Sequence, residues 1–203
     1  MNTAKAQVST EKPTVNKIIE AAIPLFATKG LAAVSVKELA DAAGVNIALI
    51  SYYFGGKENL YAFVLEKQLA ILESMIDSIS KEDISPIMKI RQFAAMLIVT
   101  HKENPYIDRL FFVEIFNPTK YFDSTVKIAA HRLHAFLQDC IKDAISKVRS
   151  DIKPDFAAIS LMKILHLSFA PQHVCGNLLP NKEDNAEQYA AQALEIYLYG
   201  VTN

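Results

Sequence analysis

The chain of 203 residues holds little glycine and proline, with 6 and 8 residues respectively. This scarcity favours helices over a turn-rich β architecture. Long apolar runs are also missing: the longest, Phe93 to Val99, holds seven residues, whereas a membrane-spanning helix needs about 18. The first residues, MNTAKAQVSTEKPTVNK, include no apolar stretch typical of a secretory signal. We therefore expect an all-α protein located in the cytoplasm.

Cysteine is scarce as well, and Cys140 and Cys175 belong to no C-x-x-C motif and to no pair with zinc-finger spacing. Two reduced thiols are expected in the cytoplasm, and a redox-responsive pair is the alternative. His131 and His134 share one face of a predicted helix, but no neighbouring cysteine or carboxylate is placed to complete a metal site. We expect neither a metal nor a cofactor.

The chain also has no excess of positive charge. It contains 21 lysines and arginines and 22 acidic residues, which gives a net charge of −1. Residues 1–61 contain no arginine at all. A prediction of nucleic-acid binding must therefore rest on a motif and not on a basic patch.

Apolar residues recur at helical spacing along most of the chain, and capping residues, Gly and Pro separate the segments. After a tail at residues 1–13, nine helices are expected, the first bent at Pro24 and the eighth kinked at Pro171. Their approximate ranges are 14–29, 35–43, 46–54, 57–79, 85–101, 106–116, 124–148, 153–175 and 184–199.

The stretch from Ser35 to Tyr61 has the pattern of a helix-turn-helix. Ser35 and Glu38 have capping-box spacing, and two short amphipathic helices flank the turn A-A-G-V that ends at Val45. Asn46 is expected to cap the second helix. The spacing turns one set of side chains outward, where a DNA major groove would meet them. These candidate base-reading residues are Asn46, Ile47, Ala48, Ser51 and Tyr52.

Three motifs in order make residues 17–61 resemble the DNA-binding domain of TetR-type (tetracycline repressor-like) regulators. The motifs are I-x-x-A-A-x-x-L-F-x-x-x-G from Ile18, S-V-x-x-L-A-x-x-A-G-V from Ser35, and Y-Y-F-x-x-K-E-x-L from Tyr52. Three features depart from the family pattern: Ser51 replaces a frequent tyrosine, Pro24 lies inside the first helix, and arginine is absent. Lys37, Tyr53 and Lys57 are the candidate phosphate contacts, because cations, hydroxyls and the first turn of a helix bind phosphate.

The resemblance implies three parts: the tail 1–13, a DNA-binding domain 14–61, and a ligand-binding and dimerisation domain 62–203. The third part is rich in large apolar side chains, and TetR-like proteins enclose a small-molecule pocket there. A mainly apolar lining with a few polar groups would suit a lipophilic or aromatic ligand. The candidate lining residues are Phe93, Met96, Phe112, Phe116, His131, His134, Phe136 and His166.

The last two predicted helices carry apolar residues on more than one side, so each must bury two faces. A partner subunit would cover the second face, and the resemblance implies a four-helix interface between two copies. The candidate interface residues are Leu161, Leu165, Phe169, Leu194 and Leu198.

The leading hypothesis is a homodimeric transcriptional regulator without enzymatic activity. It would repress by binding a palindromic, double-stranded DNA operator, and a small effector would release it, with no role for a membrane. The second hypothesis is a helical small-molecule carrier or sensor that has lost DNA binding. The third, an α-helical enzyme, would need a convergent titratable cluster, and the sequence does not indicate one.

Overall fold

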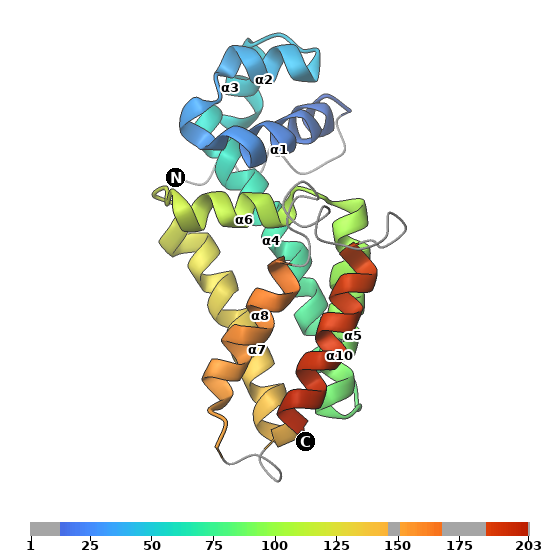
Figure 1. Cartoon of the computed structure of the whole chain (residues 1–203). Coiled ribbons are helices and arrows are strands. Elements are labelled where there is room, and N and C mark those ends of the chain that lie inside the picture. The colour runs from blue at the N-terminus through green and yellow to red at the C-terminus, as the bar shows by residue number, and fades with distance from the viewer. Residues whose placement is uncertain (1–12, 146–150, 168–185, 203) are drawn as a thin grey trace. The chain divides into compact units, whose positions relative to one another are not determined.

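The computed structural model describes residues 13–145, 151–167 and 186–202. These residues form nine α-helices and one π-helical turn (Figure 1) and include no strand. The all-α fold and the nine helices predicted from the sequence are confirmed. The helices are α1 (Pro13–Ala33), α2 (Val36–Ala43), α3 (Ala48–Phe54), α4 (Lys57–Ser80), α5 (Pro86–Glu103), α6 (Ile107–Phe116), α7 (Lys127–Ile145), α8 (Pro154–Leu167) and α10 (Ala186–Thr202), with the π-helical turn η1 at Phe122–Val126.

The chain divides into two compact units, and the division differs from the expected boundary after residue 61. Unit 1 comprises residues 1–70 and 106–127, and unit 2 comprises 71–105 and 128–203. Helix α6 therefore belongs with α1, α2 and α3 in unit 1, where it packs against α1. Helix α4 is continuous from Lys57 to Ser80 and contributes residues to both units.

The first helix continues through Pro24 and breaks later, at Gly30. Gly30 has a φ of 74° and a ψ of 167°, which are outside the helical region, and a positive φ is accessible to glycine without steric cost. Pro24 therefore does not end the helix, and the break lies at Gly30, the last residue of the first sequence motif.

The turn between α2 and α3 has the capping predicted from the sequence. The Ser35 side chain accepts a hydrogen bond from the Glu38 backbone N–H at 3.1 Å. Gly44 ends α2 in the left-handed conformation, with a φ of 63°, and its N–H bonds back to the last turn of the helix. These two caps fix where α2 begins and ends.

A buried polar network lies in the core of unit 1. The Tyr61 hydroxyl donates to Glu114 Oε1 at 2.5 Å, and the backbone N–H and hydroxyl of Thr119 donate to Glu114 Oε2 at 3.2 and 3.1 Å. Glu114 and Tyr61 are fully buried. Burial, and then the hydrogen bond to Glu114, raise the pKa of Tyr61. The network joins α4 to α6 and to the segment that follows it.

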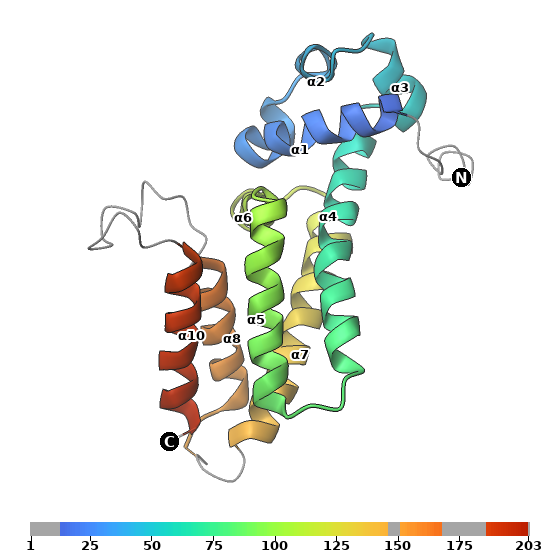
Figure 2. The same ribbon diagram turned by 90° about the vertical axis from the view of Figure 1, so that its right-hand side faces the viewer.

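Unit 2 has its own apolar core, built from the second half of α4 and from α5, α7, α8 and α10. Figure 2 shows α10 beside both α5 and α8. The Tyr197 hydroxyl donates to the Ala157 carbonyl at 2.7 Å and joins α10 to α8, and burial raises the pKa of Tyr197 to about 12. Arg91 pairs with Glu195 at 2.7 Å between α5 and α10.

Two expected boundaries differ in the structure. The helix predicted from residue 124 is preceded by η1 and begins as an α-helix at Lys127. The last helix continues past Gly200 to Thr202. The expected tail up to residue 12, the kink at Pro171, the residue Cys175 and the loop 176–183 lie outside the described residues.

Across the described helices, none combines the length and the apolar character that crossing a membrane requires.

The cap at Ser35 gives a stability prediction. Replacing Ser35 with Ala removes the acceptor for the Glu38 N–H, and we expect a loss of about 1 kcal/mol in the free energy of unfolding. Ser51→Ala makes the same chemical change inside α3, at an exposed position, and should leave the stability almost unchanged. Urea unfolding of both variants measures the difference. Equal stability of the two variants would contradict the assigned cap.

Candidate nucleic-acid interface and ligand cavity

Helix α3 is fixed to unit 1 by one face and exposes the other. Ile50 and Phe54 are buried. On the opposite face, Ile47 is 49% exposed and Tyr52 is 67% exposed. Ala48 and Ser51 are exposed beside them. The residues that the spacing directed outward are therefore all accessible to a large partner.

Both ends of α3 are set by local hydrogen bonds. The Asn46 side-chain oxygen accepts from the Ala48 N–H at 2.9 Å, so Asn46 organises the first turn as predicted, although the helix proper begins after Ile47. Gly55 ends the helix with a φ of 73°, and its N–H donates to the Ser51 carbonyl at 2.8 Å. Because Asn46 uses its oxygen internally, its amide N–H groups are the part left for an external partner.

The exposed face of α3 is polar and apolar but uncharged, since its sequence ALISYYF contains no ionisable group apart from the tyrosine phenols. The rings of Tyr52 and Tyr53 meet edge to face, with centroids 5.0 Å apart, and Tyr53 is half-buried. Lys37 on α2 is exposed. Hydroxyl, amide and methyl groups therefore dominate this surface.

Lys57, expected to bind a phosphate, has other partners in the structure. Its ammonium donates to the carbonyls of Leu31 at 2.9 Å and Val34 at 2.8 Å, and its side chain is half-buried. Sequence spacing placed Lys57 at the start of α4 but could not reveal acceptors 26 and 23 residues earlier. Two of its three N–H donors are therefore directed into the chain itself.

A second lysine, which the sequence did not single out, joins α1 to α2. Lys29 pairs with Glu38 at 2.5 Å, and this hydrogen bond lowers the pKa of the Glu38 carboxyl. The sequence assigned Glu38 to a capping box. The Ser35 half of that motif is present, while the Glu38 carboxylate bonds to Lys29.

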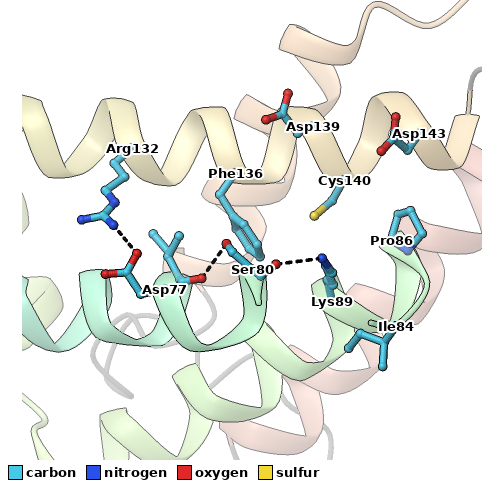
Figure 3. Close-up of a pocket in the computed structure, with 11 residues that line it drawn as sticks. Asp77, Ser80, Ile84, Pro86, Lys89, Arg132, Phe136, Asp139, Cys140 and Asp143 are labelled. Atoms are coloured by element: carbon cyan, nitrogen blue, oxygen red, sulfur yellow. Dashed lines mark hydrogen bonds and ion pairs between the residues drawn. The ribbon is translucent and has the colours of Figure 1, made fainter. Parts of the chain in front are cut away.

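Unit 2 contains a cavity of about 510 Å³ between the end of α4, the start of α5 and α7 (Figure 3). This volume lies within the usual range for small-molecule sites. The lining residues are Ile76, Asp77, Ser80, Ile84, Pro86, Lys89, Arg132, Phe136, Asp139, Cys140 and Asp143.

The predicted pocket residues lie mostly elsewhere, and Phe136 is the one shared with this cavity. Phe93 is buried in the core of unit 2, with its ring centroid 5.7 Å from that of Phe136. Phe112 and Phe116 belong to unit 1, where they stack on each other, and Phe116 is 75% exposed. Phe93 therefore packs inside unit 2, whereas Phe116 lies at the surface of unit 1. Of the other four, His166 is buried, Met96 and His134 are half-buried, and His131 is exposed.

The wall of the cavity combines apolar and charged groups. Arg132 bonds to Asp77 and lies 3.7 Å from Glu73. Lys89 donates to the Ser80 carbonyl at 3.2 Å, where a cation complements the C-terminal end of α4. Burial raises the pKa of the Cys140 thiol to about 11. Cys140 is thus protonated at neutral pH, which disfavours redox reactivity.

Four of the predicted interface leucines are part of the core of unit 2. Leu161 and Leu165 on α8 and Leu194 and Leu198 on α10 are buried, and Phe169 lies outside the described residues. The second apolar face predicted for these helices consists of other side chains, because the leucines already pack within their own chain. The exposed ones are Phe156, Ile159, Tyr189, Ile196 and Tyr199.

Comparisons with known proteins agree with this architecture. Residues 18–64 match the family described as bacterial regulatory proteins, tetR family. The chain is 44% identical over 73 residues to the probable HTH-type transcriptional regulator YttP of Bacillus subtilis, a match that covers 34% of this chain and 35% of that protein. It is 34% identical over 101 residues to the HTH-type transcriptional repressor SCO4008 of Streptomyces coelicolor, with 50% and 49% covered.

These matches span a third to a half of the curated relatives' length. The fold extends further, since the ketosteroid transcriptional regulator KstR2 of Mycobacterium tuberculosis superposes with a TM-score of 0.77 over 96% of this chain and 97% of that one, at 17% identity. The matched motif contains α2, α3 and the start of α4, whose geometry is described above. Residues 18–64 therefore match the DNA-binding domain of the tetR family, and the chain is similar to TetR-type transcriptional regulators.

Proposed function

We propose that the protein is a homodimeric transcriptional repressor that binds a palindromic operator through α3 and is released by a small ligand. The observation that carries this proposal is the division of α3 into a buried face, Ile50 and Phe54, and an exposed face around Tyr52. A short helix held in this way is suited to entering a major groove. Such a protein would act in the cytoplasm, where bacterial DNA is found.

Base reading would use hydrogen bonds from neutral groups together with apolar contacts. The Ile47 and Ala48 side chains suit thymine methyl groups, and the Tyr52 hydroxyl and the Asn46 amide N–H groups suit base edges. Lys37 and the Tyr53 hydroxyl are the proposed phosphate contacts. Residues 1–61 contain no arginine, so the frequent bidentate contact of arginine with guanine is not part of this proposal.

Repression, rather than activation, is supported by the similarity to SCO4008, an HTH-type transcriptional repressor that matches half of this chain at 34% identity. A two-fold dimer presents two copies of α3, which should read half-sites centred about 34–36 Å apart or a multiple of that distance. Selection of bound sequences from a random duplex pool tests operator binding directly.

Tyr52→Ala should weaken binding to the selected operator and relax its sequence preference, because the exposed ring is lost from the reading face. One lost base contact costs about 1–3 kcal/mol per half-site. Phe116→Ala removes an equally exposed aromatic ring from α6 and is the matched control. Affinity is measured by fluorescence anisotropy. Tyr52→Ala binding with unchanged affinity and preference would remove Tyr52 from the interface.

The dimer interface is proposed to lie on the exposed apolar faces of α8 and α10, which are in contact with each other. Ile196 is 74% exposed and Tyr199 is 73% exposed, while Phe156 and Ile159 are exposed on α8. Neighbouring helices that both expose large apolar side chains are typical of an interaction surface. A second copy of the chain is the proposed partner, which fits a symmetric operator.

Ile196→Lys should convert the dimer into a monomer, because each copy would bury an unpaired ammonium in an apolar interface at a cost of several kcal/mol. Ile128→Lys is the control, since Ile128 is an exposed isoleucine of the same unit on α7. Light scattering measures the mass of each variant. A dimer that persists in Ile196→Lys would place the interface elsewhere.

The cavity of unit 2 is the proposed effector site. Its floor includes buried Ile76, Phe136 and Cys140, and its rim carries Lys89 and Asp143 among other charged groups. This lining suits an amphipathic molecule with an apolar body and polar groups better than the purely lipophilic or aromatic ligand expected from the sequence. Binding would release DNA only if the ligand prefers the conformation that does not bind the operator.

Ile84→Trp should fill part of the cavity and abolish ligand binding, because Ile84 lines it from the connection between α4 and α5. Met88→Trp is the control, since Met88 is exposed on α5 and does not line the cavity. Thermal-shift screening would compare small amphipathic amines and acids with hydrocarbons of matched size. A ligand that still stabilises Ile84→Trp as it does the unmodified protein would exclude this cavity.

A further inference from the structure

We propose that Lys57 is a positioning residue that closes the helix-turn-helix segment into a loop and thereby sets the direction of α3. This inference rests on the proposed function, because it concerns how the reading helix is presented to DNA. Its basis is the pair of hydrogen bonds from the Lys57 ammonium to the Leu31 and Val34 carbonyls, at 2.9 and 2.8 Å.

This role follows from where the two acceptor carbonyls, Leu31 and Val34, lie in the sequence. Val34 immediately precedes Ser35, the cap of α2, and Lys57 is the first residue of α4. The segment 35–56 between Val34 and Lys57 includes α2, the turn at Gly44 and the whole of α3. The Lys57 ammonium therefore joins the two ends of the segment 35–56, which contains α2 and α3.

Glycines with positive φ adjoin both ends of this segment. Gly30, with a φ of 74°, precedes Leu31, and Gly55 and Gly56, with φ of 73° and 128°, precede Lys57. Glycine gives the chain more conformational freedom than any other residue. The two hydrogen bonds link Lys57, which follows Gly55 and Gly56, to the backbone that follows Gly30. They therefore restrict the backbone on both sides of the segment at once.

The lysine contact between α1 and α2 cannot replace this connection. The Lys29–Glu38 pair joins α1 to α2 and leaves the chain beyond α3 untouched. Helix α3 packs through Ile50 and Phe54, and the Phe54 ring meets that of Phe63 on α4 with centroids 5.7 Å apart. In the sequence, the flexible pair Gly55 and Gly56 joins α3 to α4. Loss of the Lys57 bonds should therefore loosen α3 more than α1 or α2.

Lysine chemistry suits this role. An ammonium has three N–H donors and no acceptor, and two of these donors are bonded to carbonyls of the chain. The side chain is half-buried, a position that suits a long methylene stem with a polar end group. Lys37, by contrast, is exposed on α2 and is the matched lysine for comparison.

The test compares Lys57→Met with Lys37→Met in operator affinity over a salt series, at a temperature where both are folded. Loss of the Lys57 hydrogen bonds should weaken binding by about tenfold or more while the slope of log affinity against log salt stays unchanged. Lys37→Met, which loses one phosphate contact per subunit, should reduce that slope by roughly 2 for the dimer. A reduced slope in Lys57→Met would make Lys57 a phosphate contact, and unchanged affinity would make its bonds merely structural. Either result overturns the proposal.

Hydrogen exchange supplies a readout that needs no DNA. In Lys57→Met, amides of α3 should exchange about tenfold faster or more, while those of α1 change little. If the unmodified protein selects no operator, the proposed function fails, and this measurement still decides whether Lys57 holds α3. Equal protection of α3 in both proteins would refute the positioning role. Should Lys57→Met fail to fold, Lys57→Arg, which keeps a cation but changes its geometry, should give a smaller increase in the same amides.

Discussion

The recognition surface depends on a helix that is too short to be stable by itself. Helix α3 has seven residues, and isolated helices shorter than about 12 residues are marginal in water. Its structure must therefore come from its surroundings: the burial of Ile50 and Phe54, the Asn46 side chain at its start, and Gly55 at its end. The surface that α3 would present to DNA is therefore determined largely by these supporting residues.

The need to support the short α3 also explains why unit 1 includes α6 together with the helix-turn-helix. Glu114 of α6 is fully buried, and its two oxygens accept from Tyr61 and Thr119. A buried carboxylate without these donors would be strongly destabilising, so the network allows few other positions of α6 against the start of α4. Because α4 continues into unit 2 without a break, it is one of the three chain connections by which a change in unit 2 would reach this arrangement.

Sequence reasoning predicted those features that depend on residues close together in the chain. Ser35 and Gly44 bound α2 as expected, and the outward set on α3 follows from helical spacing alone. Contacts between distant residues were not accessible in this way. The carbonyl partners of Lys57 and the lining of the cavity arise where segments distant in the sequence meet, and no local pattern encodes those contacts. For α10, the pattern indicated two apolar faces but could not tell that Leu194 packs inward and Ile196 outward.

In α3 and α10, one face packs into the fold and the opposite face is exposed and accessible to a partner. In α3, Ile50 and Phe54 hold the helix, while Ile47 and Tyr52 project from it. In α10, Leu194 and Leu198 belong to the core, and Ile196 and Tyr199 are exposed. Exposed positions contribute little to stability, since substitutions away from cores and caps usually change it by less than about 0.5 kcal/mol. The proposed reading face of α3 and the proposed dimer face of α10 can therefore change sequence without loss of the fold. Lys57 cannot vary so freely, because its side chain bonds to the Leu31 and Val34 carbonyls.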